Sequence, residues 1–284
     1  MILCSKGINF DFSKKTYIMG VLNVTPDSFS DGGLYFDKDK AVEQGLRLVE
    51  DGADIIDIGG ESSRPGSIPV SRDEEIRRTI PVINALAKKI PVPISIDTYK
   101  SDVARQALDA GASMVNDISG LRFDPDMAAV ISQYGVPVII MHIKGIPKNM
   151  QINPVYDALI PEIMDYLREG INICRENGIP EDRIIIDPGI GFGKTFDHNL
   201  EIINNLKEFS LLGKPIAIGV SRKAFIGKIL GDAPASERLE GTASAVAISV
   251  YNGANIVRVH DVAEMSKVVK IADAIKRQTC SVSS

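Results

Sequence analysis

The chain has 284 residues, of which 44% are hydrophobic and 24% charged, and a formal net charge of −5. This composition is typical of a globular protein with a large core, and the acidic balance without basic clusters argues against a general binder of nucleic acid or of anionic membranes. No apolar run reaches the roughly 20 residues of a membrane span, the first residues lack a secretory signal, and three scattered cysteines indicate no disulfide framework, so we expect a cytoplasmic protein.

Eight apolar runs follow one another along the chain, each separated from the next by a helix-like stretch. They are rich in Ile and Val and lack clean alternation of polar and apolar residues, as do strands that are buried on both faces. Parallel strands need long crossovers, so eight such units predict one closed (β/α)8 TIM barrel in a single domain spanning residues 1–284. The expected strands are Tyr17–Asn23, Ile55–Gly59, Pro93–Asp97, Met114–Ile118, Pro137–His142, Ile184–Asp187, Pro215–Val220 and Asn255–His260.

Turn and cap signals favour the same architecture. Ser71 and Glu74 have capping-box spacing ahead of a helix that reaches Lys89. Helical periodicity is also clear over Glu162–Asn177 and Ala243–Asn252. A short hairpin is expected at about residues 2–12, under the floor of the barrel. Glycines that precede the strand runs are expected to take the left-handed conformation that ends a helix. They are Gly52, Gly111, Gly135, Gly178 and Gly253.

Each apolar run ends at a residue that can take part in binding or catalysis. In a (β/α)8 barrel the active site lies at the carboxyl ends of the strands, so these residues are expected to converge on one pocket. The ends of the runs are Asn23, Gly59-Gly60-Glu61, Asp97, Asn116, His142, Asp187, Ser221 and His260.

Two carboxylates and an amide, Asp97, Asp187 and Asn116, end three of the runs. Such a group could bind a metal, act as acid and base, or hold a flat polar heterocycle. A carboxylate suits the edge of an amino-pyrimidinone, since its two oxygens can accept two parallel N–H bonds. The alternative is that the acids cap loops by binding backbone amides. Apolar residues at matching positions would cover the faces of the ring, and these are Ile118, Met141 and Phe192.

Basic residues gather after the last two runs. Ser221 and Lys223 follow the seventh run. Arg258 and His260 end the eighth at alternate positions, so both side chains point the same way. Phosphate sites in these barrels commonly form here and at a helix N-terminus, so this group, together with Arg64, is predicted to surround a diphosphate. The alternatives are an ion pair for Arg258 and a packed ring for His260.

Oxygen ligands for a metal ion follow the first run. Asn23, with Asp27 and Asp31 on the loop after it, offers a few hard oxygens, and these suit Mg2+ shared with substrate phosphates. His142 and His198 have no partners at metal-binding spacing, so no zinc site is predicted.

Five segments together resemble the signatures of the dihydropteroate synthase family. They are Asn23–Gly33 (NVTPDSFSDGG), Asp57–Gly66 (DIGGESSRPG), Asp187–Lys194 (DPGIGFGK), Gly219–Lys223 (GVSRK) and Arg258–His260 (RVH). The resemblance covers the chain from about Tyr17 to Asp261. Several separate motifs in the right order make it specific, unlike a single glycine-rich pattern.

The resemblance implies a pterin-binding (β/α)8 barrel and a transferase of folate biosynthesis. Such an enzyme condenses 4-aminobenzoate with 6-hydroxymethyl-7,8-dihydropterin diphosphate, giving 7,8-dihydropteroate and diphosphate. It is the target of sulfonamides, which mimic the aminobenzoate. The family also implies Mg2+ as the cofactor and a homodimer formed through barrel helices.

The resemblance also assigns a role to each matching residue. The pterin would be held by Asp97, Asn116, Ile118, Met141, Asp187, Phe192, Gly219, Lys223 and Arg258. The diphosphate would be held by Asn23, Arg64, Arg258 and His260, and the aminobenzoate by Phe29, Ser63, Pro65 and Ser221. Mg2+ would bind Asn23 and Asp31, and the catalytic residues would be Asp97, Lys223, Arg258 and Asp31.

Two alternatives share the pterin site. A methyltransferase that passes a methyl group from methyltetrahydrofolate to a corrinoid needs none of the phosphate-binding residues after the last two runs. It usually also needs a cobalamin module, yet no Asp-x-His-x-x-Gly segment occurs in the chain. A non-catalytic pterin-binding barrel would lack diphosphate and metal contacts. The residues predicted for those contacts are nevertheless all in place: Asn23, Asp31, Arg64, Arg258 and His260.

Overall fold

The computed structural model describes residues 2–25 and 37–279, and its centre is an eight-stranded parallel sheet curled into a barrel. The predicted (β/α)8 architecture is therefore confirmed. The sheet order is β8-β7-β6-β5-β4-β3-β10-β9, so the first and last strands of the barrel, β3 and β10, are paired. The strands are β3 (Tyr17–Asn23), β4 (Ile55–Gly59), β5 (Ile94–Asp97), β6 (Met114–Asp117), β7 (Val138–Met141), β8 (Ile184–Asp187), β9 (Ala217–Ile218) and β10 (Ile256–Val259).

The barrel closes between β8 and β9 through little backbone pairing. A single parallel bridge pairs Ile186 with Ile216, and the Ile186 amide donates to the Pro215 carbonyl at 2.9 Å. The strand β9 has only 2 residues, although the sequence predicted one over 215–220. Pro215 has no N–H to donate to a neighbouring strand, and Gly219 has little preference for a sheet, so regular pairing stops at both positions.

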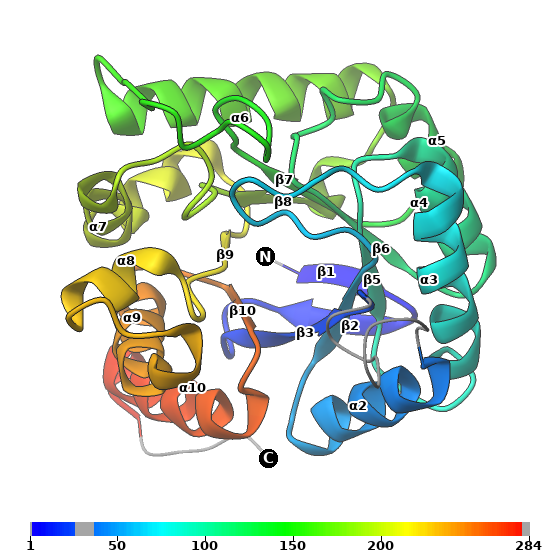
Figure 1. Cartoon of the computed structure of the whole chain (residues 1–284), viewed down its shortest axis with the longest axis horizontal. Helices are drawn as coiled ribbons and strands as arrows, with labels where there is room; N and C mark the ends of the chain where they lie inside the picture. The colour runs from blue at the N-terminus through cyan, green and yellow to red at the C-terminus, as the bar shows by residue number, and fades with distance from the viewer. Residues whose placement is uncertain (1, 26–36, 280–284) are drawn as a thin grey trace.

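Helices follow the strands and form a ring outside the barrel (Figure 1). They are α2 (Lys38–Glu50), α3 (Arg72–Leu86), α4 (Ser101–Asp109), α5 (Met127–Tyr134), α6 (Leu159–Glu176), α7 (Phe196–Asn204), α8 (Ala224–Ile229), α9 (Leu239–Tyr251) and α10 (Val262–Arg277). Short 3-10 helices cover Glu181–Arg183, Leu206–Leu212 and Ala235–Glu237. Within residues 2–25 and 37–279, no helix is both long and apolar enough to cross a membrane.

Local signals in the sequence mark where the helices begin and end. The Ser71 hydroxyl accepts the Glu74 amide at 3.3 Å at the start of α3. All the glycines predicted to be left-handed have positive φ, from 62° at Gly135 to 119° at Gly253. This conformation lets the last turn of a helix bond its free carbonyls before the chain enters the next strand.

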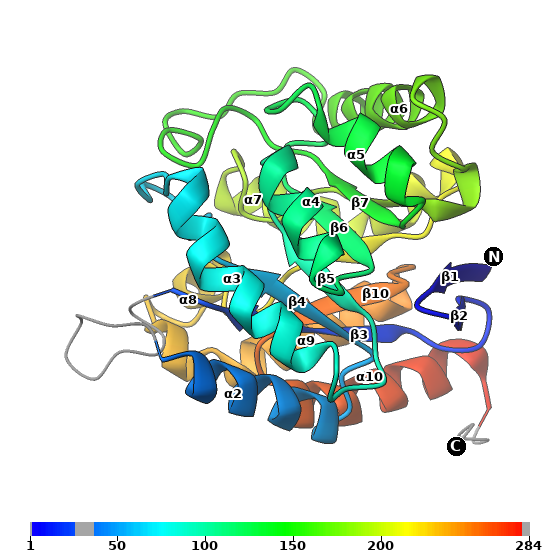
Figure 2. The ribbon, with the colours of Figure 1, turned by 90° about the vertical axis from the view of Figure 1, so that its right-hand side faces the viewer.

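An antiparallel hairpin, β1 (Ile2–Ser5) with β2 (Ile8–Asp11), covers one end of the barrel. Figure 2 shows it on the side away from the long loops that follow the barrel strands. Leu3 and Phe10, each 1% exposed, pack against an apolar layer inside the barrel. The hairpin therefore closes the floor and leaves the opposite end for a site. The layer above it contains Met19, Ile55, Met114, Ile139, Ile185 and Ile256.

The strand register places polar side chains on one level near the open end. Asp97 of β5 is in register with Gly59 of β4 and with Asn116 of β6. Met141 of β7 is in register with Asp187 of β8. Because alternate residues of a strand face the same side, these side chains line the interior above the apolar layer. We call this open end of the barrel the mouth.

Candidate active site

Arg258 of β10 reaches across the mouth to two carboxylates. Its Nε donates to Asp57 Oδ2 at 2.6 Å, and its Nη2 donates to Asp97 Oδ2 at 2.7 Å. Burial lowers the pKa of Arg258, but these two carboxylates outweigh burial and raise the pKa above its ordinary value. The guanidinium therefore stays charged. The ion-pair alternative for Arg258 is correct, and the pair lies within the predicted site.

Asp57 is a residue of this site that sequence reasoning missed, because it lies within a strand instead of at its end. Its side chain is fully buried. Oδ2 also accepts from Asn116 Nδ2 at 3.1 Å, so this carboxylate connects two residues predicted to bind the pterin. The other oxygen, Oδ1, is buried and has no partner among the described residues. The available signal was an acid inside an otherwise apolar run, since buried charges are rare.

Asp187 ends β8 and binds the loop that follows it. It is 7% exposed, and its Oδ1 accepts the Gly189 amide at 2.7 Å. Burial raises the pKa of Asp187 to about 6, against the effects of that bond and of Lys223. Gly189 has φ 73°, and a Cβ there would lie 1.9 Å from the His142 carbonyl oxygen. The loop-capping alternative therefore holds for one oxygen of Asp187, and only glycine permits this loop path.

Burial also shifts the pKa values of Asp97 and Lys223 at the mouth. It raises the pKa of Asp97, while the pairing with Arg258 opposes the rise. It lowers the pKa of Lys223 to about 8, and the positive charge of Arg258 adds to this effect. The Lys223 Nζ lies 4.4 Å from the centroid of the Phe192 ring. One apolar cluster contains all three residues predicted to cover a flat ring, and its members are Ile118, Met141, Ile143, Met150 and Phe192.

His260 and Ser221 are partners beside the mouth. The His260 amide donates to Ser221 Oγ at 3.2 Å, and Oγ lies 3.0 Å from the ring Nδ1. The hydroxyl can then donate to Nδ1, which leaves the ring proton on Nε2. Burial, together with the positive charge of Arg258, lowers the pKa of His260 to about 3, so the ring is neutral at physiological pH. Arg222 turns away and pairs with Asp261.

Two of the strand ends do not join the site. His142 is 4% exposed, with Lys194 Nζ at 2.9 Å from its Nδ1 and the Tyr166 ring of α6 packed edge-on at 4.7 Å. It follows Met141, which faces inward, so alternation turns it outward. Glu61 binds Lys100, with 2.6 Å between Oε2 and Nζ. The expectation that every strand end lines one pocket is therefore wrong for these two residues.

The remaining predicted residues lie on strand ends and loops. Asn23 ends β3 and is half-buried, as is Ser63 on the loop between β4 and α3. Arg64 and Pro65 on the same loop are exposed, and the charge of Arg64 contributes to lowering the pKa of Lys223. Gly219 directly follows β9, next to Arg258. Three predicted loop residues, Asp27, Phe29 and Asp31, lie outside the described residues.

The segment from residue 19 to residue 260 matches a family model described as pterin binding enzyme. Over 268 residues the chain is 49% identical to the dihydropteroate synthase of Synechocystis, covering 94% of this chain and 93% of the relative. The chain belongs to the dihydropteroate synthase family. The dihydropteroate synthases of Bacillus subtilis and Escherichia coli are 47% and 42% identical to it, each over 96% of this chain and over 93% and 96% of the relatives.

Solved dihydropteroate synthases share the fold. The Yersinia pestis enzyme in complex with a sulfonamide drug has a TM-score of 0.92 and 40% identity, and the match covers 98% of this chain and 100% of that one. The Clostridium difficile enzyme with pteroic acid has a TM-score of 0.88 and 47% identity, covering 94% and 98%. As a dihydropteroate synthase, the chain is a transferase that forms a carbon–nitrogen bond. The relatives favour this activity over the methyltransferase and the non-catalytic barrel.

Proposed function

We propose that the mouth condenses 4-aminobenzoate with 6-hydroxymethyl-7,8-dihydropterin diphosphate to give 7,8-dihydropteroate and diphosphate. The observation that carries this proposal is the meeting of Asp97, Asn116, Asp187, Lys223 and Arg258 beside one apolar cluster. Hydrogen-bond acceptors, cations and apolar surface are thus available together for a pterin diphosphate. Structures of the Xanthomonas albilineans enzyme with 4-aminobenzoic acid and with 7,8-dihydropteroate support the same assignment.

The pterin edge is assigned to Asp187, Asp97 and Asn116. Asp187 uses Oδ1 for the Gly189 amide, which leaves Oδ2 to accept an N–H of the ring. Asp97 uses Oδ2 for Arg258, which leaves Oδ1. These acceptors match the donor-rich edge of an amino-pyrimidinone. The rest of the pterin surface is assigned to Ile118, Met141, Phe192, Gly219, Lys223 and Arg258.

The diphosphate is assigned to the basic side of the mouth, where Asn23, Arg64, Arg258 and His260 lie. Arg64 and Arg258 supply positive charge, and neutral His260 donates through Nε2 because its Nδ1 faces Ser221. Negative charge grows on the diphosphate as its bond to the pterin methylene breaks. Donors and cations already in place stabilise that charge, so the proposed catalysis is electrostatic and needs no strong base.

Mg2+ is the proposed cofactor, with Asn23 and Asp31 as protein ligands. Asn23 ends β3 at the mouth and offers one amide oxygen, whereas Asp31 lies outside the described residues. A small number of protein oxygens is enough for Mg2+, because this ion keeps several waters and also binds the phosphates of substrates. When bound, the ion supplies positive charge against the departing diphosphate.

The aminobenzoate is assigned to Ser63, Pro65 and Ser221, with Phe29 from outside the described residues. The loop that carries Ser63 and Pro65 is held at its tip, where the Gly66 amide donates to the Pro147 carbonyl at 3.1 Å. Sulfonamides resemble aminobenzoate, so they are proposed to compete for this part of the mouth. The Yersinia pestis structure with a sulfonamide drug supports that assignment.

The deciding experiment measures diphosphate release from 6-hydroxymethyl-7,8-dihydropterin diphosphate with Mg2+, in the presence and absence of 4-aminobenzoate. Release that requires the amine and yields dihydropteroate is the expected result. Omission of Mg2+ with excess chelator should abolish release if the cofactor assignment is right. Tight pterin binding without any turnover would refute the proposed reaction.

The pH profile tests the role of Lys223. We expect kcat/KM for the pterin diphosphate to fall above about pH 8, because the ammonium, whose pKa is lowered to about 8 by burial, loses its proton. Lys223→Arg should remove this alkaline limb, since a guanidinium stays charged. On the acid side, kcat/KM should fall below about pH 6 as Asp187 becomes protonated. An alkaline limb that is unchanged in Lys223→Arg would rule out this assignment.

We also place the protein in the cytoplasm. Among the described residues, Cys4 and Cys174 are free thiols. Burial raises the pKa of Cys174 to about 12, so this thiol is unreactive and its role is packing. Free thiols of this kind are typical of a reducing compartment.

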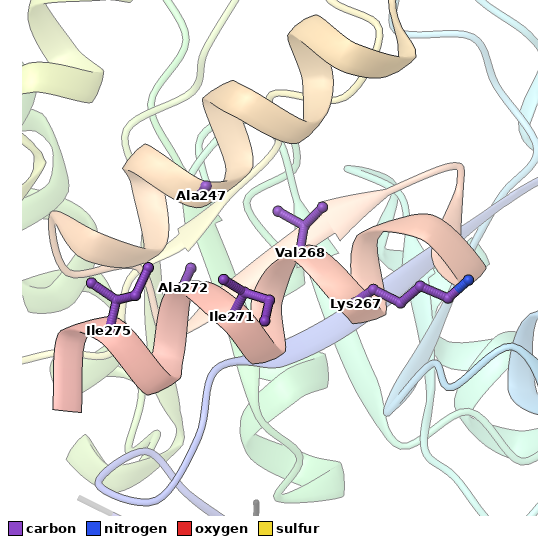
Figure 3. Close-up of a pocket in the computed structure, with 6 residues that line it drawn as sticks. All are labelled: Ala247, Lys267, Val268, Ile271, Ala272 and Ile275. Carbon is purple, nitrogen blue, oxygen red and sulfur yellow. The ribbon is translucent and has the colours of Figure 1, made fainter. Parts of the chain in front are cut away.

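A second copy of the chain is proposed to cover an apolar face formed by α9 and α10. Ile248 and Tyr251 of α9 are 51% and 62% exposed, and Ile271 and Ile275 of α10 are 64% and 62% exposed. Gathered apolar side chains of this kind mark interfaces, and a two-fold dimer would bury both copies of the face. Figure 3 shows a pocket on this face, lined by Ala247, Lys267, Val268, Ile271, Ala272 and Ile275.

Ile271→Glu tests the dimer. We expect sedimentation equilibrium to show a dimer for the unchanged protein and at least about a hundredfold weaker association for the variant, because a buried carboxylate would lie at the centre of the interface. Ile152→Glu is the matched control, since Ile152 is 78% exposed and lies on the loop between β7 and α6, outside the two helices of this face. A monomer for the unchanged protein, or equal weakening by both substitutions, would contradict the assignment.

A further inference from the structure

A cluster of buried charges lies at the base of the loop between β4 and α3, outside the mouth. Lys100 Nζ is 2.6 Å from Glu61 Oε2 and 2.5 Å from Glu75 Oε2. It also donates to the Val70 carbonyl at 2.9 Å. The side chains of Lys100, Glu61 and Glu75 are 17%, 9% and 1% exposed. All three donors of the ammonium are therefore used, and its position is fixed.

The charge cluster joins both ends of one loop to a neighbouring helix. Glu61 begins the loop, and its Oε2 accepts the amide of Val70, near the loop's end, at 2.8 Å. Lys100 is the residue at the N-terminal cap of α4, and Glu75 lies in the first turn of α3. One ammonium thus fixes loop 61–70 to the starts of two barrel helices.

Tyr99 connects the same cluster to the apolar wall of the mouth. Its hydroxyl donates to Glu61 Oε1 at 2.7 Å. Its ring packs edge-on against Phe123, with 5.4 Å between centroids, and both rings pack against the cluster that contains Phe192. Both carboxylate oxygens of Glu61 are therefore bound, Oε1 by Tyr99 and Oε2 by Lys100 and Val70, which leaves the start of the loop little freedom.

Removing these charges from water costs free energy, and only close contacts between them offset that cost. Burial raises the pKa of Glu75, and the charge of Lys100 opposes that rise. Buried ion pairs are often no more stabilising than apolar residues of the same shape, whereas the loss of one partner is strongly destabilising. The cluster is therefore better explained by the fixed position of the loop than by a gain in stability.

We propose that Lys100 is a positioning residue that holds loop 61–70 in the shape that presents Ser63 and Pro65 to 4-aminobenzoate. This inference rests on the proposed function, in which that loop forms part of the aminobenzoate site. Lys100 touches no substrate in this scheme and acts through Glu61 and Val70. Its loss should weaken aminobenzoate binding most. Binding of the pterin diphosphate should change much less, through Arg64 alone, because the residues assigned to the pterin ring lie on strands and on loops other than 61–70.

Lys100→Met is the test variant, and Lys15→Met is its matched control. Lys15 also lies 2.6 Å from a carboxylate, that of Asp54, and 4.8 Å from the centroid of a tyrosine ring, compared with 4.9 Å for Lys100. We expect Lys100→Met to raise KM for 4-aminobenzoate roughly tenfold to a hundredfold, because small displacements of binding groups have effects of this size. KM for the pterin diphosphate should rise clearly less than KM for 4-aminobenzoate, because only Arg64 of its assigned residues lies on the loop, and kcat should be largely retained.

Comparison of a single and a double variant separates an effect on the position of loop 61–70 from an effect on the stability of the protein. Lys100→Met leaves Glu61 and Glu75 facing each other without a cation, whereas Lys100→Met with Glu75→Gln removes one of the charges. The double variant should unfold at a higher temperature than the single variant and yet keep the raised KM for 4-aminobenzoate. If Lys100→Met does not fold, the double variant alone decides.

Two outcomes would overturn the inference. One is an unchanged KM for 4-aminobenzoate in the folded variants, and the other is an equal rise in KM for both substrates. Absence of dihydropteroate formation by the unchanged protein would instead refute the proposed function. The two failures are therefore distinguishable in a single set of assays.

Discussion

Asp187→Asn is expected to lower kcat/KM for the pterin diphosphate about a thousandfold without unfolding the protein. Asp187 Oδ1 accepts the Gly189 amide at 2.7 Å, and Oδ2 is assigned to an N–H of the pterin. An asparagine can keep the Gly189 bond only through its carbonyl oxygen. Its NH2 group would then face the N–H donors of the pterin, so donor would meet donor in a buried site. Steady-state kinetics with saturating 4-aminobenzoate measures the loss.

Asp117→Asn is the control for this variant. Asp117 is also buried at the end of a strand, burial raises its pKa to about 6, and its two oxygens accept the amides of Ser119 and Leu121. It points away from the mouth, so the substitution should reduce stability by about 1–3 kcal/mol through a lost backbone bond and keep kcat/KM. Similar kinetic losses in both variants would show that Asp187 acts through the fold.

Arg258→Met is expected to abolish detectable turnover and to lower the free energy of unfolding by about 3–5 kcal/mol. The substitution leaves Asp57, which is fully buried, and Asp97 without their shared cation. Two uncompensated carboxylates then face each other inside the barrel. Urea titration at pH 7.5 measures the stability, and the diphosphate assay measures the turnover.

The pH dependence of the stability of Arg258→Met shows whether Arg258 stabilises the fold through its charge or through its packing. Burial raises the pKa of Asp97, and the variant loses the arginine that opposes this rise. The folded variant therefore binds more protons than the unfolded chain, and its stability rises as the pH falls. Arg258→Lys is the matched control, because it keeps the positive charge and loses the planar guanidinium that donates to two carboxylates at once. It should recover most of the stability and little of the activity. An Arg258→Met protein that is as stable as the unchanged chain at pH 7.5 would contradict the structural role of the ion pairs.

Much of this site could be predicted from sequence because a closed barrel brings the ends of its strands together. Asn116 and Asp187 each end an apolar run, and strand register alone places both at the mouth. The left-handed glycines were predictable for a similar reason, since the turn from helix to strand demands their conformation. The short strand β9 was not, because the sequence shows an apolar run and not whether each of its residues finds a partner.

Contacts between distant segments could not be predicted. Asp57 and Arg258 are 201 residues apart, and neither residue indicates the other in the sequence. His142 was expected at the mouth, but Lys194, 52 residues later, lies against its ring. A strand pattern tells which side a residue faces. The paths of loops and of packed helices decide which partner it meets there, and those paths depend on the whole fold.

The pairing of β3 with β10 has a consequence for synthesis on the ribosome. An early and a late part of the nascent chain complete the same layer, since Phe10 and Ile256 belong to one cluster and Thr16 binds Asp273, 257 residues away. Until β10 has left the exit tunnel, β3 presents an unpaired sheet edge to the solvent. Such edges recruit other strands, so chaperones should bind chains arrested before residue 256 and release them once the last strand is made.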